Sequence, residues 1–223
     1  MGFRSGQHHL PMKFRTRCFC SYKVNFLEQP NDSHIRIGWS QAFAVVQACV
    51  GYNKFSYGWR SKHGTKFHDA IGKSYHAGGF KQGDVLGCLI HLPEQHYSST
   101  CTSLDLLPES HKEAPLINFK HHFFFEENDE PAEKLKKLKP LKGSKIEFFH
   151  NGKSCGVAYQ DIYAGAYYPA VSIFHKAKIG VNFGPKFQKL PPGARGMHVR
   201  GDEHQIEQTV SDILYLVEHG TLA

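Results

Sequence analysis

Residues 34–68 read HIRIGWSQAFAVVQACVGYNKFSYGWRSKHGTKFH, and this stretch is the part of the sequence that says most about the fold. Two short segments within it, residues 35–40 and 56–59, are rich in aromatic and β-branched side chains. Such a composition is typical of strands, and Gly and Asn residues between the segments, such as Gly51 and Asn53, favour turns. We therefore expect two short strands joined by an irregular connection.

Similar segments flank this stretch on both sides. We expect further strands at residues 18–26, 85–92, 116–125, 145–149, 157–160, 168–174 and 178–182. Gly, Pro, Asn and Asp punctuate the gaps, and Asn151-Gly152 is a strong hairpin signal because this pair supplies the positive φ angles of a type I′ turn. Many short strands at this spacing predict a mainly β fold, an antiparallel β-sandwich, over residues 18–187.

Two segments have helical patterns. The first begins at Pro131 within a lysine-rich insertion at residues 129–144, and a proline suits a first helical turn. Its exposed lysines fit a solvated surface, and a phosphate-binding role is the alternative. The candidates for nucleic-acid contact in this insertion are Lys134, Lys136, Lys137 and Lys139.

The second helix is expected at residues 202–219, with Asp202 able to cap it and Gly220 able to end it. Apolar residues recur there with helical period and form one stripe. The stripe consists of Ile206, Val210, Ile213, Leu214 and Val217. Residues 188–201 are rich in Pro and Gly and are predicted to be a linker. The stripe therefore either folds back on the sandwich or enters a groove of a partner, and the pattern leaves both open.

The composition bounds the class of protein. The chain has 223 residues with a net charge of +7, which fits one domain with appendages and favours acidic partners. Residues 1–17 form a basic segment without acids. No apolar run approaches the ~18 residues of a membrane span, so no membrane association is expected. The six cysteines include no C-x-x-C pair, and we expect reduced thiols because no secretory signal is visible.

Recognisable catalytic motifs are missing from the sequence. It contains no G-x-x-x-x-G-K-[ST], G-x-G-x-x-G, G-x-S-x-G or H-E-x-x-H pattern. Its histidine doublets do not have metal-ligand spacing. We therefore expect no enzyme activity, no catalytic residue, no metal and no cofactor.

Several motifs carry a family resemblance in the expected order. They are R-x-G-W from Arg36, GDVLG from Gly83, F-x-N-G from Phe149, Y-P-A-V-S from Tyr168 and V-N-F-G from Val181. These elements resemble the SPRY (B30.2-like) family. Residues 51–68 look specifically like the Ash-two (absent, small or homeotic discs two) subunits of COMPASS-type histone methyltransferase complexes. The resemblance runs from about residue 20 to residue 217.

The resemblance implies a nuclear scaffold that does not itself catalyse a reaction. In this family the SPRY face binds an acidic segment of a retinoblastoma-binding-protein-five-like WD-repeat subunit. The positions that match its binding residues are Arg36, Tyr52, Arg60 and Lys62, while Cys49 stands where the family usually has proline. The C-terminal helix resembles the motif that binds a Dpy-thirty dimer, with Val210, Ile213, Leu214 and Val217 at the contact positions. A separate SET-domain methyltransferase then methylates lysine 4 of histone H3.

The residues themselves agree with peptide binding. An arginine offers a planar fork that can pair with a carboxylate through two hydrogen bonds, and nearby aromatic residues give rigid contact area. The simpler reading is that Arg36 and Arg60 pair with local acids or stack on tryptophans as structural surface. Two other functions remain as alternatives: a SPRY receptor in another complex, such as a ubiquitin ligase, and a basic module that contacts nucleosomal DNA.

Residues 1–17 diverge from the family. They do not resemble the opening strands of its SPRY domain, so we expect a sandwich that lacks its first strands. Such a sandwich would expose a sheet edge and core side chains.

Overall fold

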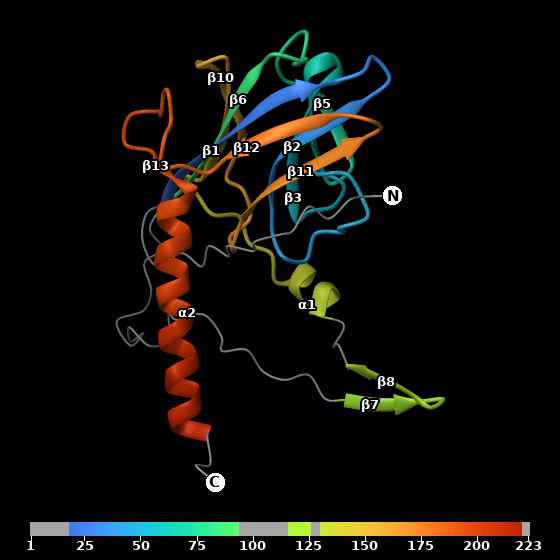
Figure 1. Cartoon of the computed structure of the whole chain (residues 1–223), viewed down its shortest axis with the longest axis vertical. Coiled ribbons are helices and arrows are strands. Elements are labelled where there is room, and N and C mark those ends of the chain that lie inside the picture. Colours follow the sequence, from blue (N-terminus) through green and yellow to red (C-terminus); the bar gives the residue numbers. More distant parts are fainter. Residues whose placement is uncertain (1–17, 94–115, 126–129, 220–223) are drawn as a thin grey trace.

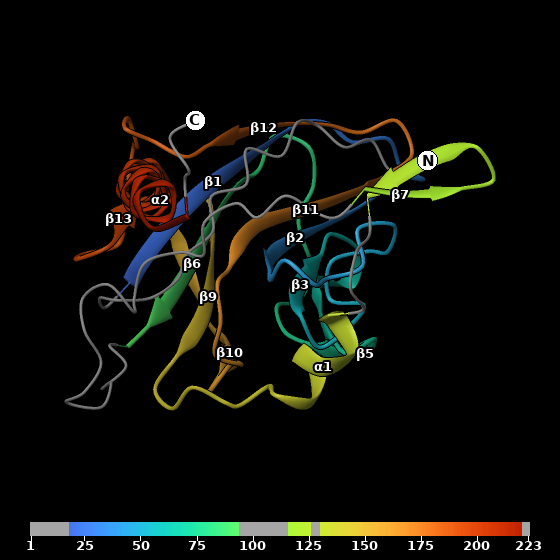
Figure 2. The same cartoon turned by 90° about the horizontal axis from the view of Figure 1, so that it is seen from below.

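The computed structural model describes residues 18–93, 116–125 and 130–219. The predicted basic segment at residues 1–17 lies outside the described residues. Most of the described chain forms two packed antiparallel sheets, from which one long helix extends (Figures 1 and 2). The predicted fold class is therefore confirmed as a mainly β sandwich with a C-terminal helix.

The larger sheet has six strands, five of them in the order β10-β9-β6-β1-β12. These strands are β10 (Lys153–Gln160), β9 (Lys145–His150), β6 (Val85–Leu92), β1 (Cys18–Glu28) and β12 (Lys178–Asn182). The two-residue strand β13 (Arg195–Gly196) pairs in parallel with β1 beyond the end of β12. Asn151 and Gly152 both have positive φ at the β9–β10 turn, which confirms the predicted hairpin.

The second sheet has five strands in the order β11-β2-β3-β4-β5. Its members are β11 (Tyr168–Phe174), β2 (His34–Ser40), β3 (Ser56–Arg60), β4 (Thr65–His68) and β5 (Ile71–Ser74). A one-turn 3-10 helix (Lys62–Gly64) connects β3 to β4. The sequence did not indicate β4 and β5, because residues 65–74 contain few apolar side chains; β4 gains its order from pairing with β3, and β5 from pairing with β4.

The remaining elements lie outside these two sheets. The predicted strand at residues 116–125 is a hairpin, β7 (Leu116–Phe119) and β8 (His122–Phe125), because Lys120 and His121 adopt positive φ between the two strands. The short helix α1 (Glu130–Lys136) lies in the lysine-rich insertion. The long helix is α2 (Met197–His219).

The start of α2 differs from the prediction. The helix begins at Met197 and not at Asp202, so the predicted linker is shorter and Asp202 lies inside the helix. Tertiary burial explains the difference. Met197, Arg200 and His204 are buried where the first turns of α2 lie against β1 and β13, and this packing stabilises helix that the Pro/Gly composition did not predict.

The core lies between the inner faces of the two sheets. Alternate residues of β2, namely Ile35, Ile37 and Trp39, are fully buried, and Tyr22 of β1 packs edge-on against Trp39 with ring centroids 5.0 Å apart. Trp59 of β3 contacts Phe148 of β9 across the sandwich in a tilted arrangement, with ring centroids 5.4 Å apart. The expectation of reduced thiols holds for Cys49, Cys88 and Cys155, but Cys20 is disulfide-bonded.

A fully buried tyrosine forms a hydrogen bond between the two sheets. The Tyr22 hydroxyl donates to the Gly38 carbonyl oxygen at 2.5 Å, and Tyr22 has no exposed surface. We expect Tyr22→Phe to lower the free energy of unfolding by about 1–2 kcal/mol, because a buried carbonyl loses its donor. Thermal unfolding should show a midpoint several degrees lower, whereas Tyr52→Phe, on an exposed ring, should leave it unchanged. Equal midpoints for the two variants would contradict this role of the bond.

Candidate peptide-binding face and partner helix

Arg36 and Arg60 lie side by side on the outer face of the second sheet. They are directly opposite each other in the β2–β3 pair, while their strand neighbours Ile35 and Trp59 point into the core. Both guanidinium groups lie over the ring of Phe67 on β4, at 3.8 Å for Arg36 and 5.0 Å for Arg60. The predicted arginines are therefore brought together on one aromatic platform.

Backbone carbonyl oxygens hold the two arginines in place. Arg36 donates from Nη1 to the Val50 carbonyl at 3.3 Å, and Arg60 donates from Nε to the Lys62 carbonyl at 3.2 Å. Among the described residues, neither arginine forms an ion pair with a carboxylate. Partial burial lowers the pKa of Arg36, with Cys49 opposing this effect and Arg60 adding to it. Two like charges held this close favour an incoming anion.

The loop between β2 and β3 supplies the flank of this face. Gly51 has a φ of 87°, and a Cβ atom there would approach the Phe67 carbonyl oxygen to 2.3 Å, so only glycine fits. Tyr52 follows it with an exposed ring, and its backbone N–H donates to the Cys49 carbonyl at 3.0 Å. Lys62 is exposed in the 3-10 turn after β3. Tyr52 and Lys62 thus flank the arginine pair from two loops.

Phe67 is the residue of this face that the sequence did not identify. Its ring has room because Gly72 is directly opposite it in the β4–β5 pair, where a Cβ atom would approach Phe67 Cε1 to 2.9 Å. The local signal was weak, since residues 65–68 read TKFH and their strand was not predicted. Only the pairing of β4 with β3 places this ring beneath both guanidinium groups.

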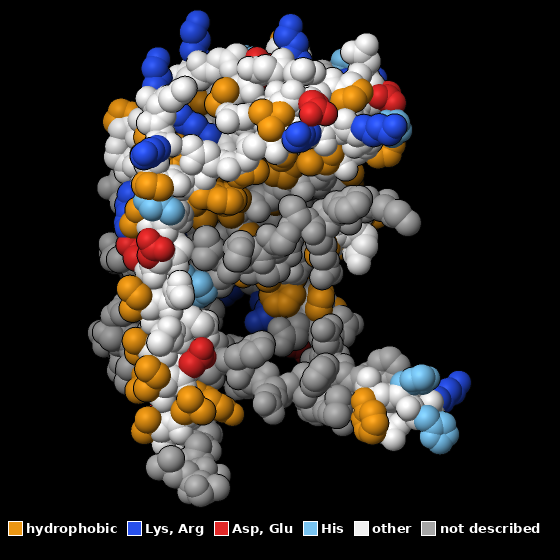
Figure 3. Space-filling view, viewed as in Figure 1, with side chains coloured by type: hydrophobic (Ala, Val, Ile, Leu, Met, Phe, Trp, Pro, Cys, Tyr) orange, Lys and Arg blue, Asp and Glu red, His pale blue; other side chains and the backbone are white. Residues whose placement is uncertain are grey.

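The buried residues of α2 and its apolar stripe lie on different sides of the helix. At ~100° per residue, Ile206, Val210, Ile213 and Val217 lie on one side, whereas Met197, Arg200 and His204 lie on another. The latter three are buried, but Val210, Ile213 and Val217 are 41%, 54% and 77% exposed. Leu214, at the margin of the stripe, is half-buried. The helix extends away from the two sheets (Figure 1), and hydrophobic side chains are visible along it (Figure 3).

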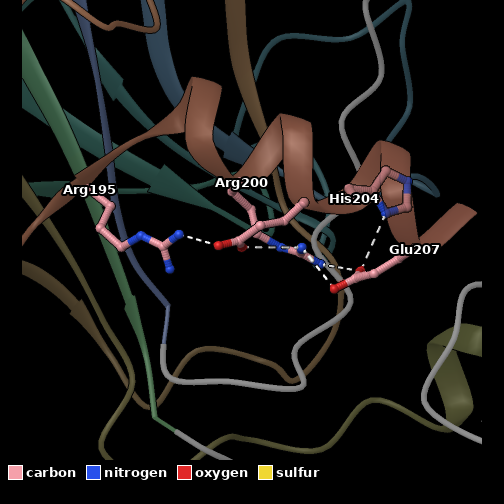
Figure 4. A network of polar contacts seen from close by, with 5 residues as sticks. Arg195, Arg200, His204 and Glu207 are labelled. Atoms are coloured by element: carbon pink, nitrogen blue, oxygen red, sulfur yellow. Dashed lines mark hydrogen bonds and ion pairs between the residues drawn. The ribbon is translucent and has the colours of Figure 1, made fainter. Parts of the chain in front are cut away.

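A network of charged residues fixes the base of α2 (Figure 4). Arg200 is almost fully buried and donates two hydrogen bonds to the Glu207 carboxylate, from Nη1 at 3.1 Å and from Nη2 at 2.8 Å. Glu203 lies 3.5 Å from Arg200 and also pairs with Arg195 of β13. Because β13 and α2 share this network, the direction in which the helix leaves the sandwich is set by ion pairs as well as by packing.

We expect Glu207→Gln to weaken the base of α2 by about 1–2 kcal/mol, because the buried Arg200 loses its bidentate charged partner but keeps Glu203. Hydrogen exchange should then become faster in the first turns of the helix. Glu218→Gln, on an exposed residue near the far end, is the matched control. Unchanged exchange in the first turns of Glu207→Gln would contradict this role of the network.

The lysines of the insertion remain a separate surface. Lys134 and Lys136 lie on α1, Lys137 and Lys139 follow it, and all four are exposed. Lys137 pairs with Glu133 at 3.7 Å, and the Lys134 ammonium lies 5.7 Å from the Phe43 ring centroid. Within residues 18–93, 116–125 and 130–219, the structure contains no group of three potential metal ligands and no helix that is long and apolar enough to cross a membrane.

Comparison with known proteins shows the family of the chain. The SPRY domain family matches residues 19–107. The Set1/Ash2 histone methyltransferase complex subunit ash-2 of Caenorhabditis elegans is 64% identical over 199 residues, which cover 88% of this chain and 35% of that protein. The Drosophila melanogaster subunit ASH2 is 47% identical over 203 residues, covering 89% of this chain and 35% of that protein.

More distant matches extend the comparison. The Set1 complex component ash2 of Schizosaccharomyces pombe is 27% identical over 84% of this chain and 33% of its own length. A crystal structure of a human SPRY domain aligns with 75% of this chain and 78% of its own, at 14% identity and a TM-score of 0.46. The chain spans about a third of the length of the curated relatives that it matches. From the matched residues and the identities, the chain belongs to the SPRY-domain family and is a relative of the Ash2 subunits along most of its length.

Proposed function

We propose that this chain is a non-catalytic scaffold subunit of a nuclear complex that methylates lysine 4 of histone H3. The observation that carries the proposal is the 64% identity to the Caenorhabditis elegans subunit over 88% of the chain. The name of that relative identifies it as a subunit of a histone methyltransferase complex. In the proposed assembly a separate SET-domain methyltransferase performs the chemistry, and this chain connects the other subunits.

The first proposed contact is an acidic peptide of a WD-repeat subunit on the face formed by Arg36, Arg60 and Phe67. Each guanidinium can form two parallel hydrogen bonds with a carboxylate, and such charge-assisted pairs are stronger than neutral hydrogen bonds. The stacking on Phe67 restricts the motion of both side chains before the peptide arrives, which lowers the entropy lost on binding. The exposed Tyr52 and Lys62 extend the contact along the peptide.

The second proposed contact is a Dpy-thirty dimer on the apolar stripe of α2. An amphipathic helix that enters a groove uses residues at i, i+3, i+4 and i+7, which is the spacing of Val210, Ile213, Leu214 and Val217. Burying four such side chains contributes a gross ~6–12 kcal/mol. Part of this is offset by lost rigid-body freedom. Because the opposite side of the helix is anchored to the sandwich, the stripe is available without unfolding the base.

Reconstitution tests the proposal. The SET-domain methyltransferase and the WD-repeat subunit would be assayed on a histone H3 peptide with and without this chain, and binding of a Dpy-thirty dimer would be measured by calorimetry. We expect the folded chain to bind the dimer and to increase the methylation rate. A folded chain that binds neither partner would reject the scaffold role.

Contact with nucleosomal DNA is a second candidate, favoured by the exposure of Lys134, Lys136, Lys137 and Lys139. The logarithm of the DNA-binding constant falls linearly with the logarithm of the salt concentration. If all four lysines pair with phosphates, replacing them by Gln should make this slope shallower by about three to four. Gel-shift titrations at several salt concentrations would measure this slope, and an unchanged slope would exclude these lysines from DNA binding.

A further inference from the structure

The face of Arg36 and Arg60 includes a turn that lies on the outer side of the second sheet. Tyr52 donates its backbone N–H to the Cys49 carbonyl oxygen at 3.0 Å, and Gly51 between them has a φ of 87°. This hydrogen bond and this positive φ are those of a type II turn. We call residues 49–52 the Tyr52 turn, because the exposed ring of Tyr52 is its proposed contact with the peptide.

The Tyr52 turn lies directly on β3 because a glycine is beneath it. A Cβ atom at Gly58 would approach the Val50 carbonyl oxygen to 2.6 Å and the Val50 Cγ1 atom to 3.2 Å. Val50 is accordingly buried. A turn in such close contact with the sheet withdraws its central backbone groups from water, so these groups need partners within the protein.

The first peptide unit of the turn is held by a serine of β11. The Val50 N–H donates to Ser172 Oγ at 2.8 Å. The carbonyl group of the same planar peptide unit belongs to Cys49 and accepts the Tyr52 N–H at 3.0 Å. The Ser172 hydroxyl and the Tyr52 backbone are thus connected through one rigid peptide unit, and hydrogen bonds in such a chain reinforce each other.

The second peptide unit is held by β2 and β3. Its Val50 carbonyl oxygen accepts Arg36 Nη1 at 3.3 Å, and its Gly51 N–H donates to Ser56 Oγ at 2.9 Å. Arg36 is itself a proposed contact of the peptide, and Ser56 is fully enclosed at the start of β3. Substitution of either residue would therefore change more than the turn, whereas Ser172 reaches the turn from a different strand.

Ser172 belongs to the row of side chains that carries the two arginines. It is directly opposite Arg36 in the β11–β2 pair, and Arg36 is directly opposite Arg60 in the β2–β3 pair. Residues opposite each other share one face of a sheet, so all three lie on the outer side. Ser172 and Val50 are 122 residues apart in the sequence, so no local pattern indicated their contact.

We propose that Ser172 is a positioning residue of the peptide-binding face, whose hydroxyl holds the Cys49–Val50 peptide unit on the sheet and so fixes Tyr52 for an acidic peptide. This inference rests on the proposed function of the face. Without the hydroxyl, the Val50 N–H loses its acceptor and the turn becomes mobile before the peptide arrives. Ordering the turn during binding then costs part of the affinity. Ser172 acts through Tyr52 and does not need to touch the peptide.

Fluorescence anisotropy of a labelled acidic peptide from the WD-repeat subunit tests the inference on the full chain. Ser172→Ala should weaken binding about three- to tenfold, which is the range expected for one hydrogen bond. Ser172→Thr keeps the hydroxyl, and a strand accepts its β-branched side chain, so it should restore binding. Ser74→Ala, at an exposed position of β5 at the other end of the same sheet, is the matched control and should bind like the original chain. Circular dichroism melts establish that each variant is folded.

Amide hydrogen exchange in the free chain gives a readout that does not depend on the peptide. The amides of Val50 and Tyr52 should exchange faster in Ser172→Ala than in the original chain, and Ser172→Thr should restore their protection. The amides of β9, in the other sheet, should exchange at an unchanged rate. This comparison separates release of the turn from a general loss of stability.

A double-mutant cycle tests whether Ser172 acts through Tyr52. Combining Ser172→Ala with Tyr52→Ala should give less than the sum of the two losses in binding free energy, because the ring that Ser172 positions is already gone. Combining Ser172→Ala with Lys62→Ala should give the sum, because Lys62 lies on the 3-10 turn after β3 and not on the Tyr52 turn.

Equal peptide affinity of Ser172→Ala and the original chain would overturn the proposal, as would a Ser172→Thr chain that binds no better than Ser172→Ala. Unchanged exchange at Val50, or losses that add fully with Tyr52→Ala, would overturn it as well. If the original chain did not bind the acidic peptide, the proposed function of the face would be rejected instead. The exchange rate of Val50 would then still decide whether Ser172 holds the turn.

Discussion

Ile213→Glu in α2 should reduce the affinity of the chain for a Dpy-thirty dimer about a thousandfold. Ile213 is 54% exposed near the centre of the apolar stripe, so the substitution should leave the free chain folded. In the complex it would remove ~2 kcal/mol of apolar burial. It would also require a carboxylate to be desolvated without a partner, at a cost of at least ~2 kcal/mol. Calorimetric titration against the dimer measures the loss.

Gln205→Glu is the matched control for this prediction. It introduces the same charge on the same helix at an exposed position about 120° from the centre of the stripe. We expect the affinity of this variant for the dimer to stay within a few-fold of the affinity of the original chain. If both variants lost binding equally, added charge on α2 would be responsible, and the assignment of the stripe as the contact would be wrong.

Arg36→Ala should weaken the binding of the acidic peptide of the WD-repeat subunit roughly 30- to 100-fold, which corresponds to ~2–3 kcal/mol. The variant removes the guanidinium that lies 3.8 Å from the Phe67 ring centroid and relieves its repulsion with Arg60. The fold should therefore survive, since no buried carboxylate among the described residues loses a partner. Titration of the peptide at constant salt gives the change.

Two variants separate the possible causes of this loss. Arg36→Lys keeps the charge but not the planar fork, so it should recover only part of the affinity. Lys153→Ala removes one exposed positive charge elsewhere and should change binding little. Full recovery by lysine would mean that the peptide responds to net charge alone. A loss in Lys153→Ala equal to that in Arg36→Ala would point to the same conclusion.

The alternation of residues along the strands already determined much of the fold. Each of the predicted strand segments contains a strand, and Asn151-Gly152 forms the predicted hairpin turn. These features depend on neighbouring residues only, because strand composition and turn chemistry act over a few positions. The helical period of the stripe from Ile206 to Val217 is likewise a property of the local sequence.

Only the tertiary structure decided where those elements act. The start of α2 at Met197 depends on burial against β1 and β13, which no local pattern encodes. The meeting of Arg36, Arg60 and Phe67 depends on the register of three strands, β2, β3 and β4, and the sequence did not indicate β4. The sequence by itself therefore determined the elements and their apolar faces. Long-range contacts decided which face of each strand meets the core and which side of α2 packs on the sandwich, because these depend on residues far apart in the chain.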